Sequence, residues 1–542
     1  MNITRVAWSS FRESLAWLWT PSFPASERAG AWRERPIKRS WGMPFASALL
    51  AAALAASAAS SPDREGGHAT VLVLPFTLQG EGSEWTGLAV AESVIDFVAQ
   101  VNQDNFITVK QLDAALRPRG IKINDGAAIT AAAQELGRTL GATDVITGEV
   151  SRKGDLFIID ARRLRVGSAS VVKQSKVQGP RAVLPLLTKK LASELAGATT
   201  KAPPLSKDQR ALEEAAACTG ILARQSLSPQ AKGTLDEAVL AEAEKHCREA
   251  LTIDPALGLA RAGLAVVLAC RGDFDSAKKE AQAARAKRFV PLAVLAESFA
   301  LRRAGDVNGS RAVLDDAVAS RPGFLHALGY LGEDRLESRD NASAKVEFER
   351  YLKRAPGHPW ATAQLAHALS RLGKKDEALK LTQEAIAKNP TDPELSIELA
   401  SRLIDLGKDV QAEPFLKSAL EANPPRILAG LRLGFLQLRG KRLKEARESF
   451  TKVASLATGT DESRVRAVAQ ADLARVSAAE GNYDEAIQHL TAAKEEGMRK
   501  LPCDEASFAQ WKGKPEMDEA CKEPENGKFD AFDENESAAI DF

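Results

Sequence analysis

Apolar residues in the first part of the chain follow two different periods. Residues 70–76 form a continuous apolar run, which is typical of a strand buried on both faces. Residues 86–101 carry apolar side chains at helical spacing, and residues 106–109 have the pattern of a second short strand. Helical patterns return over residues 110–116 and 127–140. The order strand, helix, strand predicts a crossover between neighbouring strands of a buried sheet.

Three further extended runs, at residues 145–150, 156–165 and 168–177, follow one another directly. Each is separated from the next by a turn that contains glycine, which is the pattern of an antiparallel meander. A helical pattern over residues 181–195 ends the region. Together, the crossover and the meander predict an N-terminal α/β domain with a mixed sheet over residues 68–200.

From residue 208 onward the pattern is helical and repeats itself. Residues of one type recur every 34 positions in three separate series. A 34-residue period with Leu-Gly, then Ala-x3-Phe and then Pro resembles the tetratricopeptide repeat. The three series are Pro322, Pro356, Pro390 and Pro424; Ala344, Ala378, Ala412 and Ala446; and Leu331, Leu365, Leu399 and Leu433.

This resemblance implies an all-α tetratricopeptide-repeat solenoid over residues 208–500. The small alanine lets the two helices of a repeat approach closely, and leucine and phenylalanine fill the space between them. Stacked pairs bury one continuous core and wind into a superhelix with a concave face. We predict seven or eight helical pairs, with the second helix of an early pair at residues 236–255 and later pairs that begin near residues 258, 291, 325, 359, 393, 427 and 467.

The α/β region also resembles a known family. Leu74-Pro-Phe76, residues 87–92 and residues 136–157 are similar to the envelope domain shared by the TolB N-terminal, FlgO and CsgG-like proteins. The resemblance implies a bacterial periplasmic or outer-membrane-associated module that engages protein partners or assembles. It carries over no catalytic residues, and the sequence has no evident pore-forming hairpin of the CsgG type.

Residues 1–60 have the pattern of a basic extension and a signal peptide. Four basic residues within residues 33–39 precede an alanine-rich apolar run at residues 43–59, which ends in small residues. Alanine is a weak membrane residue, so we expect cleavage rather than a permanent anchor. The tryptophan-rich stretch before the basic residues is either an extended signal region or the result of a start codon placed too far upstream. A signal peptide near residues 33–60 predicts an exported protein, either periplasmic or associated with the outer membrane.

Charge argues against nucleic acid as a partner. The 73 Lys and Arg residues are balanced by 72 Asp and Glu residues, so no global field attracts nucleic acid or an anionic membrane. Acidic residues are concentrated instead at the end of the sequence. Like charges and low hydrophobicity predict that residues 501–542 are a disordered tail that confers solubility, with mimicry of a peptide ligand as the alternative.

Cysteine and histidine residues predict neither a disulfide scaffold nor a metal site. The five cysteines are scattered and lack CxxC spacing, and only a bridge between Cys503 and Cys521 is left open. The six histidines are dispersed, and His246 beside Cys247 lacks a second pair of ligands. We therefore expect no cofactor.

The sequence has no recognisable catalytic motif. The glycines of Gly80-Glu81-Gly82 do not make a dinucleotide fingerprint, because Trp85 takes the third glycine position and acidic residues replace positive charge. The motifs of serine hydrolases, zinc proteases and kinases are missing from the sequence as well. The chain is predicted not to be an enzyme.

Binding of another protein is the function that the repeats predict. By resemblance, tetratricopeptide repeats hold extended peptides or helices on their concave face, which the first helix of each pair lines. Several charges and one large aromatic residue on this face would suit a polar peptide with an apolar anchor. The predicted contact residues are His326, Glu333, Glu337, Trp360, His367, Arg371, Ser401 and Asp405.

Our leading hypothesis is a non-enzymatic scaffold of the cell envelope. Its α/β domain would dock or assemble, in association with outer-membrane assembly, and its solenoid would recruit a protein or peptide partner. The alternative is a regulatory or ligand-sensing protein whose α/β domain binds a small molecule and whose solenoid relays the occupancy. A convergent polar pocket would favour the alternative. The sequence leaves the identity of the partner and the oligomeric state open.

Overall fold

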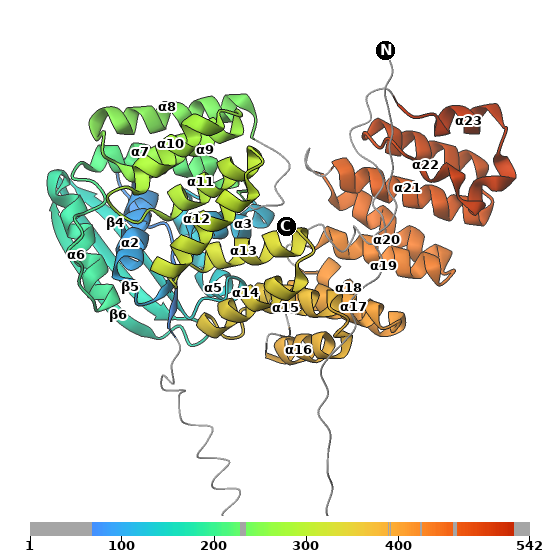
Figure 1. Cartoon of the computed structure of the whole chain (residues 1–542), viewed down its shortest axis with the longest axis horizontal. Coiled ribbons are helices and arrows are strands. Elements are labelled where there is room, and N and C mark those ends of the chain that lie inside the picture. Colours follow the sequence, from blue (N-terminus) through green and yellow to red (C-terminus); the bar gives the residue numbers. More distant parts are fainter. Residues whose placement is uncertain are drawn as a thin grey trace, which may run out of the picture. The chain divides into compact units, whose positions relative to one another are not determined.

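A computed structural model of the chain describes most of the residues after the predicted signal peptide (Figure 1). The predictions for residues 1–60 and for Pro424 lie outside the described residues. None of the described helices combines the length and the apolar character that a membrane span requires. The described residues are 68–524, except 228–234, 389, 391, 423–424 and 459–462.

The α/β domain is built on a six-stranded mixed sheet with the strand order β3-β1-β4-β5-β6, in which β2 also pairs with β4. Strand β1 lies parallel to β3 and β4, whereas β4, β5 and β6 form an antiparallel meander. The predicted mixed sheet is confirmed. The strands are β1 Thr70–Val73, β2 Thr77–Gln79, β3 Asn105–Phe106, β4 Asp144–Lys153, β5 Leu156–Arg165 and β6 Val171–Pro180.

Five helices accompany this sheet in the described α/β region. The strand predicted at residues 106–109 is shorter than expected, because Thr108 caps the next helix through a reciprocal capping box with Gln111. Helix α2 reaches the sheet closely at Gly87, where a Cβ atom would lie 1.9 Å from the carbonyl oxygen of Phe76. Only glycine allows this approach. The helices are α2 Thr86–Val101, α3 Val109–Leu116, α4 Gly126–Ala131, α5 Ala133–Thr139 and α6 Leu184–Ala196.

Helices α7 to α22 pair in chain order into eight pairs within the described residues. The first helices begin at the predicted residues, except that the last pair begins at Ser463 instead of 467. Their bounds are α7 Gln209–Ile221, α8 Glu237–Ile253, α9 Gly258–Cys270, α10 Phe274–Arg285, α11 Pro291–Arg303, α12 Val307–Ser320, α13 Leu325–Glu337, α14 Asn341–Arg354, α15 Pro359–Arg371, α16 Lys375–Lys388, α17 Pro393–Asp405, α18 Asp409–Leu420, α19 Ile427–Arg439, α20 Leu443–Leu456, α21 Ser463–Glu480 and α22 Tyr483–Glu495.

Small residues bring the two helices of a pair together. All four alanines of the predicted series are fully buried in the second helices. Gly332 of α13 faces the ring of Phe348, and a Cβ atom there would lie 2.5 Å from Cζ of that ring. Gly434 of α19 has the same relation to Phe450, with a separation of 2.5 Å from Cε1. Because glycine has no Cβ atom, it leaves room for the phenylalanine ring that fills the space between the two helices.

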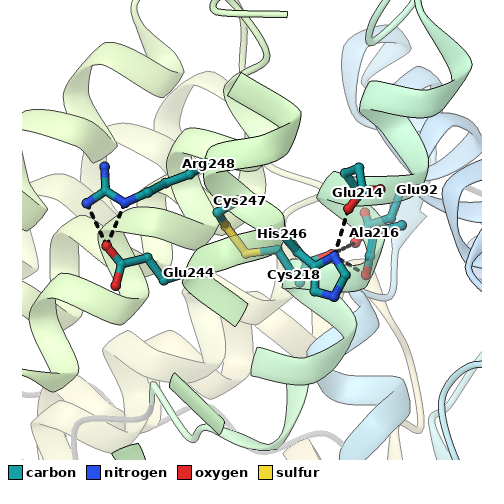
Figure 2. The surroundings of a disulfide bond; sticks show 9 residues. Glu92, Glu214, Ala216, Cys218, Glu244, His246, Cys247 and Arg248 are labelled. Atoms are coloured by element: carbon teal, nitrogen blue, oxygen red, sulfur yellow. Dashed lines mark hydrogen bonds and ion pairs between the residues drawn. A yellow bond between two sulfur atoms is a disulfide. The ribbon is translucent and has the colours of Figure 1, made fainter. Parts of the chain in front are cut away.

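Two disulfides correct the cysteine prediction. Cys218 and Cys247 join α7 to α8 although they are 29 residues apart in the sequence, because the two helices of the pair lie side by side (Figure 2). The bridge left open between Cys503 and Cys521 is also formed. Gly263 of α9 lies over the first disulfide, and a Cβ atom there would come within 2.6 Å of both sulfur atoms. Both bridges lie in the end regions of the array.

The prediction that residues 501–542 are disordered is wrong for residues 501–524. This segment forms two short 3-10 helices, η5 Pro502–Asp504 and η6 Ala506–Trp511, and helix α23 Pro515–Cys521. Its few apolar residues are buried, and the ring of Trp511 meets that of Tyr483 of α22 edge to face at 5.2 Å. The segment therefore caps the last helical pair, a role that its acidic composition concealed. Residues 525–542 lie outside the described residues.

Candidate protein interface

The α/β domain packs along the first part of the array. The rings of Phe106 in β3 and Phe324 before α13 stack with their centroids 5.6 Å apart. Trp85 lies against Gly220 of α7, where a Cβ atom would come within 2.4 Å of the indole ring. The Phe106 N–H donates to the Gly323 carbonyl at 3.4 Å. We call helices α7–α14 the docked half of the array and helices α15–α22 its distal half.

Polar groups in this contact are matched across it. The side chain of Asn105 donates to the backbone carbonyl of Arg354 at 2.9 Å, and the Arg354 Nε–H donates back to Asn105 Oδ1 at 3.1 Å. The ammonium group of Lys110 in α3 donates to three backbone carbonyl groups that follow α7, and two of these bonds measure 3.0 and 2.6 Å. A cation at the C-terminal end of a helix also complements the helix dipole. The contact is therefore specific as well as apolar.

A small cavity of about 50 Å³ lies between helices α2 and α3 of the α/β domain and helices of the docked half. Its lining is mostly apolar, and the carboxyl of Glu92 meets the hydroxyl of Thr219 there at 3.5 Å. Burial, together with the nearby charge of Asp96, raises the pKa of Glu92 to about 7. Burial also raises the pKa of Asp96 to about 6, although its ion pair with Arg288 opposes the shift. The cavity has room for a few water molecules.

Two of the predicted contact residues are buried, and a third packs with one side of its ring while part of its surface stays exposed. His326 is buried, and its Nδ1 lies 2.8 Å from Thr108 Oγ1 of the α/β domain. Burial, and then the charge of Lys110, lower its pKa to about 3. The prediction that His326 contacts a peptide is therefore wrong. Glu333 is buried as well, and the half-buried ring of Trp360 meets Phe348 edge to face at 5.8 Å.

Four other predicted residues lie at the surface or close to it. Glu337 is exposed and pairs with Arg302. Arg371 is exposed and donates to the backbone carbonyl of Leu336 at 3.1 Å. Asp405 accepts a hydrogen bond from Ser370 Oγ at 2.6 Å. Ser401 accepts one from Arg432 Nη1 at 2.8 Å. The last two bonds link neighbouring first helices of the distal half.

His367 lies among three arginines of the distal half. Its ring is half-buried in α15, and burial is the main cause that lowers its pKa to about 3. The charges of Arg402, Arg371 and Arg432 lower it further. The imidazole is therefore neutral near pH 7. Arg402 pairs with Glu398 and Asp405, so carboxylates as well as guanidinium groups surround it.

The sequence analysis missed an apolar stripe next to these charges. Phe435 and Arg439 follow Ser401 and Asp405 by the same 34 positions as the earlier series, so extending the period by one repeat finds them. The apolar residues of the stripe are half-buried, and Phe435 meets Phe450 edge to face at 5.9 Å. We call the following residues the distal face: His367, Arg371, Ile397, Ser401, Ile404, Asp405, Leu428, Arg432, Phe435, Leu438 and Arg439.

Comparison with protein families identifies the helices. Residues 335–403 match a family model described as tetratricopeptide repeat, and residues 412–506 match one described as tetratricopeptide repeat-like domain. The array is made of tetratricopeptide repeats. Proteins with these repeats generally mediate protein–protein interactions, and their repeats bind protein partners. The predicted α/β domain followed by a tetratricopeptide solenoid is thereby confirmed as the fold class.

Several solved structures are similar to part of the chain. A tetratricopeptide repeat protein from Parabacteroides merdae is 16% identical and covers 43% of this chain and 92% of its own, with a TM-score of 0.34. The Pseudomonas aeruginosa protein pilF is 15% identical, and the match covers 43% of this chain and 97% of pilF, with a TM-score of 0.33. Yeast Tom70 is 18% identical, and the match covers 53% of this chain and 60% of the Tom70 chain, with a TM-score of 0.41. No curated protein matches the sequence.

Proposed function

We propose that this protein is a non-enzymatic scaffold of the cell envelope that recruits a protein partner through the distal face of its tetratricopeptide array. The observation that carries the proposal is the difference between the two halves. In the docked half, the α/β domain already contacts the repeats, whereas the distal half presents half-buried apolar side chains beside guanidinium groups. An apolar centre with a charged rim is the usual anatomy of a protein interface.

The aromatic and arginine side chains of this face are the residue types that dominate binding energy in interfaces. Phe435 is the largest apolar side chain of the distal face, and Arg432 and Arg439 belong to the same helix, α19. We expect Phe435 to be the central anchor for the partner and the arginines to set its orientation.

Two disulfides support a place in the cell envelope. Disulfides persist in oxidising compartments such as the bacterial periplasm and are rare in the cytosol. The bridges Cys218–Cys247 and Cys503–Cys521 therefore agree with the signal peptide that the sequence predicts near residues 33–60. The resemblance of the α/β domain to TolB N-terminal, FlgO and CsgG-like domains points to the same compartment.

The test compares two apolar-to-acid substitutions in the distal half. Phe435→Asp alters the distal face, whereas Val410→Asp alters α18, where Val410 is 80% exposed. Each full-length variant is captured from cells after cross-linking, and the bound proteins are quantified by mass spectrometry. We expect Phe435→Asp to lose at least about 90% of the specific partner signal, in line with the loss of a hot-spot residue. Equal recovery with both variants, at equal thermal stability, would refute the proposal.

A second candidate function is the sensing of a small ligand in the cavity at the junction of the two domains. Glu92 and Asp96 give this cavity two carboxyl groups beside an apolar wall. Its volume of about 50 Å³ suits water molecules better than a metabolite, so we rank this function second. Thermal shift measurements with small amines would support it, if the shift disappeared in Glu92→Gln.

A further inference from the structure

We propose that residues 525–542 of this same chain bind the distal face and compete there with the partner protein. The inference rests on the proposed function, because both ligands would use one surface. It assigns the acidic segment a regulatory role in place of the solubility role that composition alone suggests. The occupant is thus a segment tethered to the array, and a partner must displace it.

The segment has the composition that the distal face requires. Residues 525–542 contain six Asp and Glu residues and one Lys. Within them, Phe529-Asp530-Ala531-Phe532-Asp533-Glu534 places two aromatic rings between carboxylates. The rings match the apolar stripe of the distal face, and the carboxylates match its guanidinium groups, which form short charge-assisted hydrogen bonds with carboxylate oxygens.

Arginines of the distal face contact neutral as well as acidic groups. Arg432 donates to the hydroxyl of Ser401, and Arg371 donates to the backbone carbonyl of Leu336. Arg439 pairs with Asp409 at the exposed side of the face, at 2.5 Å. A guanidinium group has five N–H donors, so a single ion pair does not use up the donors of Arg439.

The length of the segment allows the contact. Helix α23 ends at Cys521 and packs on α22, so the segment starts from the distal end of the array. An extended chain spans about 3.3 Å per residue, so ten residues cover about 33 Å. Packed helices lie about 8–10 Å apart, and α19, which carries Phe435, contacts α21 directly. A short tether of this kind raises the effective concentration of the ligand to the millimolar range.

A labelled peptide tests the inference without any knowledge of the partner. A fluorescein-labelled peptide with the sequence of residues 525–542 is titrated with the full chain and with a chain that ends at Pro524, and binding is followed by fluorescence anisotropy. We expect saturable binding to the shortened chain, and binding at least about tenfold weaker to the full chain, because the tethered copy competes. Replacing the acidic residues of the segment in the full chain by Asn and Gln should restore binding of the peptide.

Two protein variants and one peptide variant locate the contact. Phe435→Asp in the shortened chain should weaken peptide binding at least about tenfold, whereas Val410→Asp should leave it unchanged. A peptide with Phe529→Ser and Phe532→Ser should bind weakly to all forms. Arg432→Gln provides a milder change of the face, in case Phe435→Asp lowers thermal stability. Equal binding to the full and shortened chains, or binding that neither substitution on the face reduces, would overturn the inference.

The partner capture described above separates the two proposals. If Phe435→Asp loses the partner and the peptide does not bind, the distal face is a partner site and the inference about the segment is wrong. If the peptide binds and partner capture does not depend on Phe435, the segment has its own site and the proposed function is wrong.

Discussion

The docked and distal halves of the array share one repeat but present different surfaces. Glu333, His367, Ser401 and Phe435 are spaced by 34 positions and occupy the same place in their first helices. Glu333 is buried in the docked half, whereas the other three are only half-buried in the distal half. The repeat therefore determines the backbone and the direction of a side chain, and the surroundings of each repeat determine how much of that side chain stays exposed.

Replacing a buried ring in each half should give the largest effect and separate the two regions. Phe324→Ala removes the stack with Phe106, and we expect it to cost about 3–5 kcal/mol, as for other buried phenylalanines. Hydrogen exchange should then increase in β3 and in the docked half together. Phe450→Ala, an equally buried residue of α20, should increase exchange in the distal half alone. Identical exchange maps for the two variants would show that the halves are not distinct.

Loss of either disulfide should weaken the end of the array that it closes. Loops of 29 and 18 residues each predict a stabilisation of about 3 kcal/mol. Replacing Cys218 and Cys247 together by alanine should lower the free energy of unfolding measured in urea and increase exchange in α7 and α8. The double replacement of Cys503 and Cys521 should act in the same way on α22 and α23. An equal increase of hydrogen exchange in the middle of the array would contradict the prediction that each disulfide stabilises only its own end.

The contact of α2 with the docked half should weaken as the pH rises. Glu92 has a pKa of about 7 in the folded protein, above its ordinary value of 4.5, so folding favours the protonated form. Stability is then highest at low pH and is lost as the pH rises toward 7, by about 2 kcal/mol between pH 5 and pH 8. Thermal melting over this range should lose most of the dependence in Glu92→Gln, while Asp96, with a pKa of about 6, retains a part.

A matched control for this pH series is Glu349→Gln, because Glu349 is an exposed carboxylate of α14. This variant should keep the pH dependence of the unmodified protein. The same pH profile in Glu92→Gln and in the unmodified protein would show that Glu92 stays ionised in the contact. Burial lowers the pKa of Lys110 to about 7, so its contribution to stability rises with pH there and opposes that of Glu92. Lys110 and Arg288 are the same in both variants, so the difference between the variants reports Glu92 alone.

Substitutions of polar residues in the two halves should change the free energy of unfolding by smaller and unequal amounts. His326→Ala removes one of the hydrogen bonds of the Thr108 hydroxyl in a buried place, and we expect a cost of about 1–3 kcal/mol. Arg439→Ala removes an ion pair at the surface, and we expect a change within about 0.5 kcal/mol. Urea unfolding of both variants checks the comparison. Equal losses would mean that Arg439 contributes as much to the packed structure as His326 does.

The sequence predicted the fold more completely than it predicted the site. The 34-residue period and the buried apolar runs are local patterns, so they located the first helices of most pairs and the mixed sheet. His326 occupies a normal contact position of the repeat, but Thr108, 218 residues away, and the neighbouring rings of Phe324 and Tyr330 pack against it. Phe435 could have been found by extending the same period, but residues 428–439 were not considered as part of the face.

Long-range contacts also explain the errors on cysteines and on the acidic segment. Cys218 and Cys247 lack any spacing motif, and only the packing of α7 against α8 brings them together. Residues 501–524 have the composition of a solvated segment, yet Phe508 and Met517 find an apolar surface at the end of the array. The contact between α7 and α8 and the apolar surface at the end of the array both form only when the helices pack. Composition alone could therefore not indicate either of them.

The hydrogen bond from Phe106 to Gly323 has a consequence for how this protein could be divided. It provides the edge strand β3 with a neighbour from the array, so a fragment cut near residue 200 would carry a bare strand edge and an uncovered phenylalanine. Grafting either domain onto an unrelated neighbour should yield insoluble material. We therefore expect the α/β domain and the early repeats to fold as one unit, and the later repeats to tolerate replacement more easily.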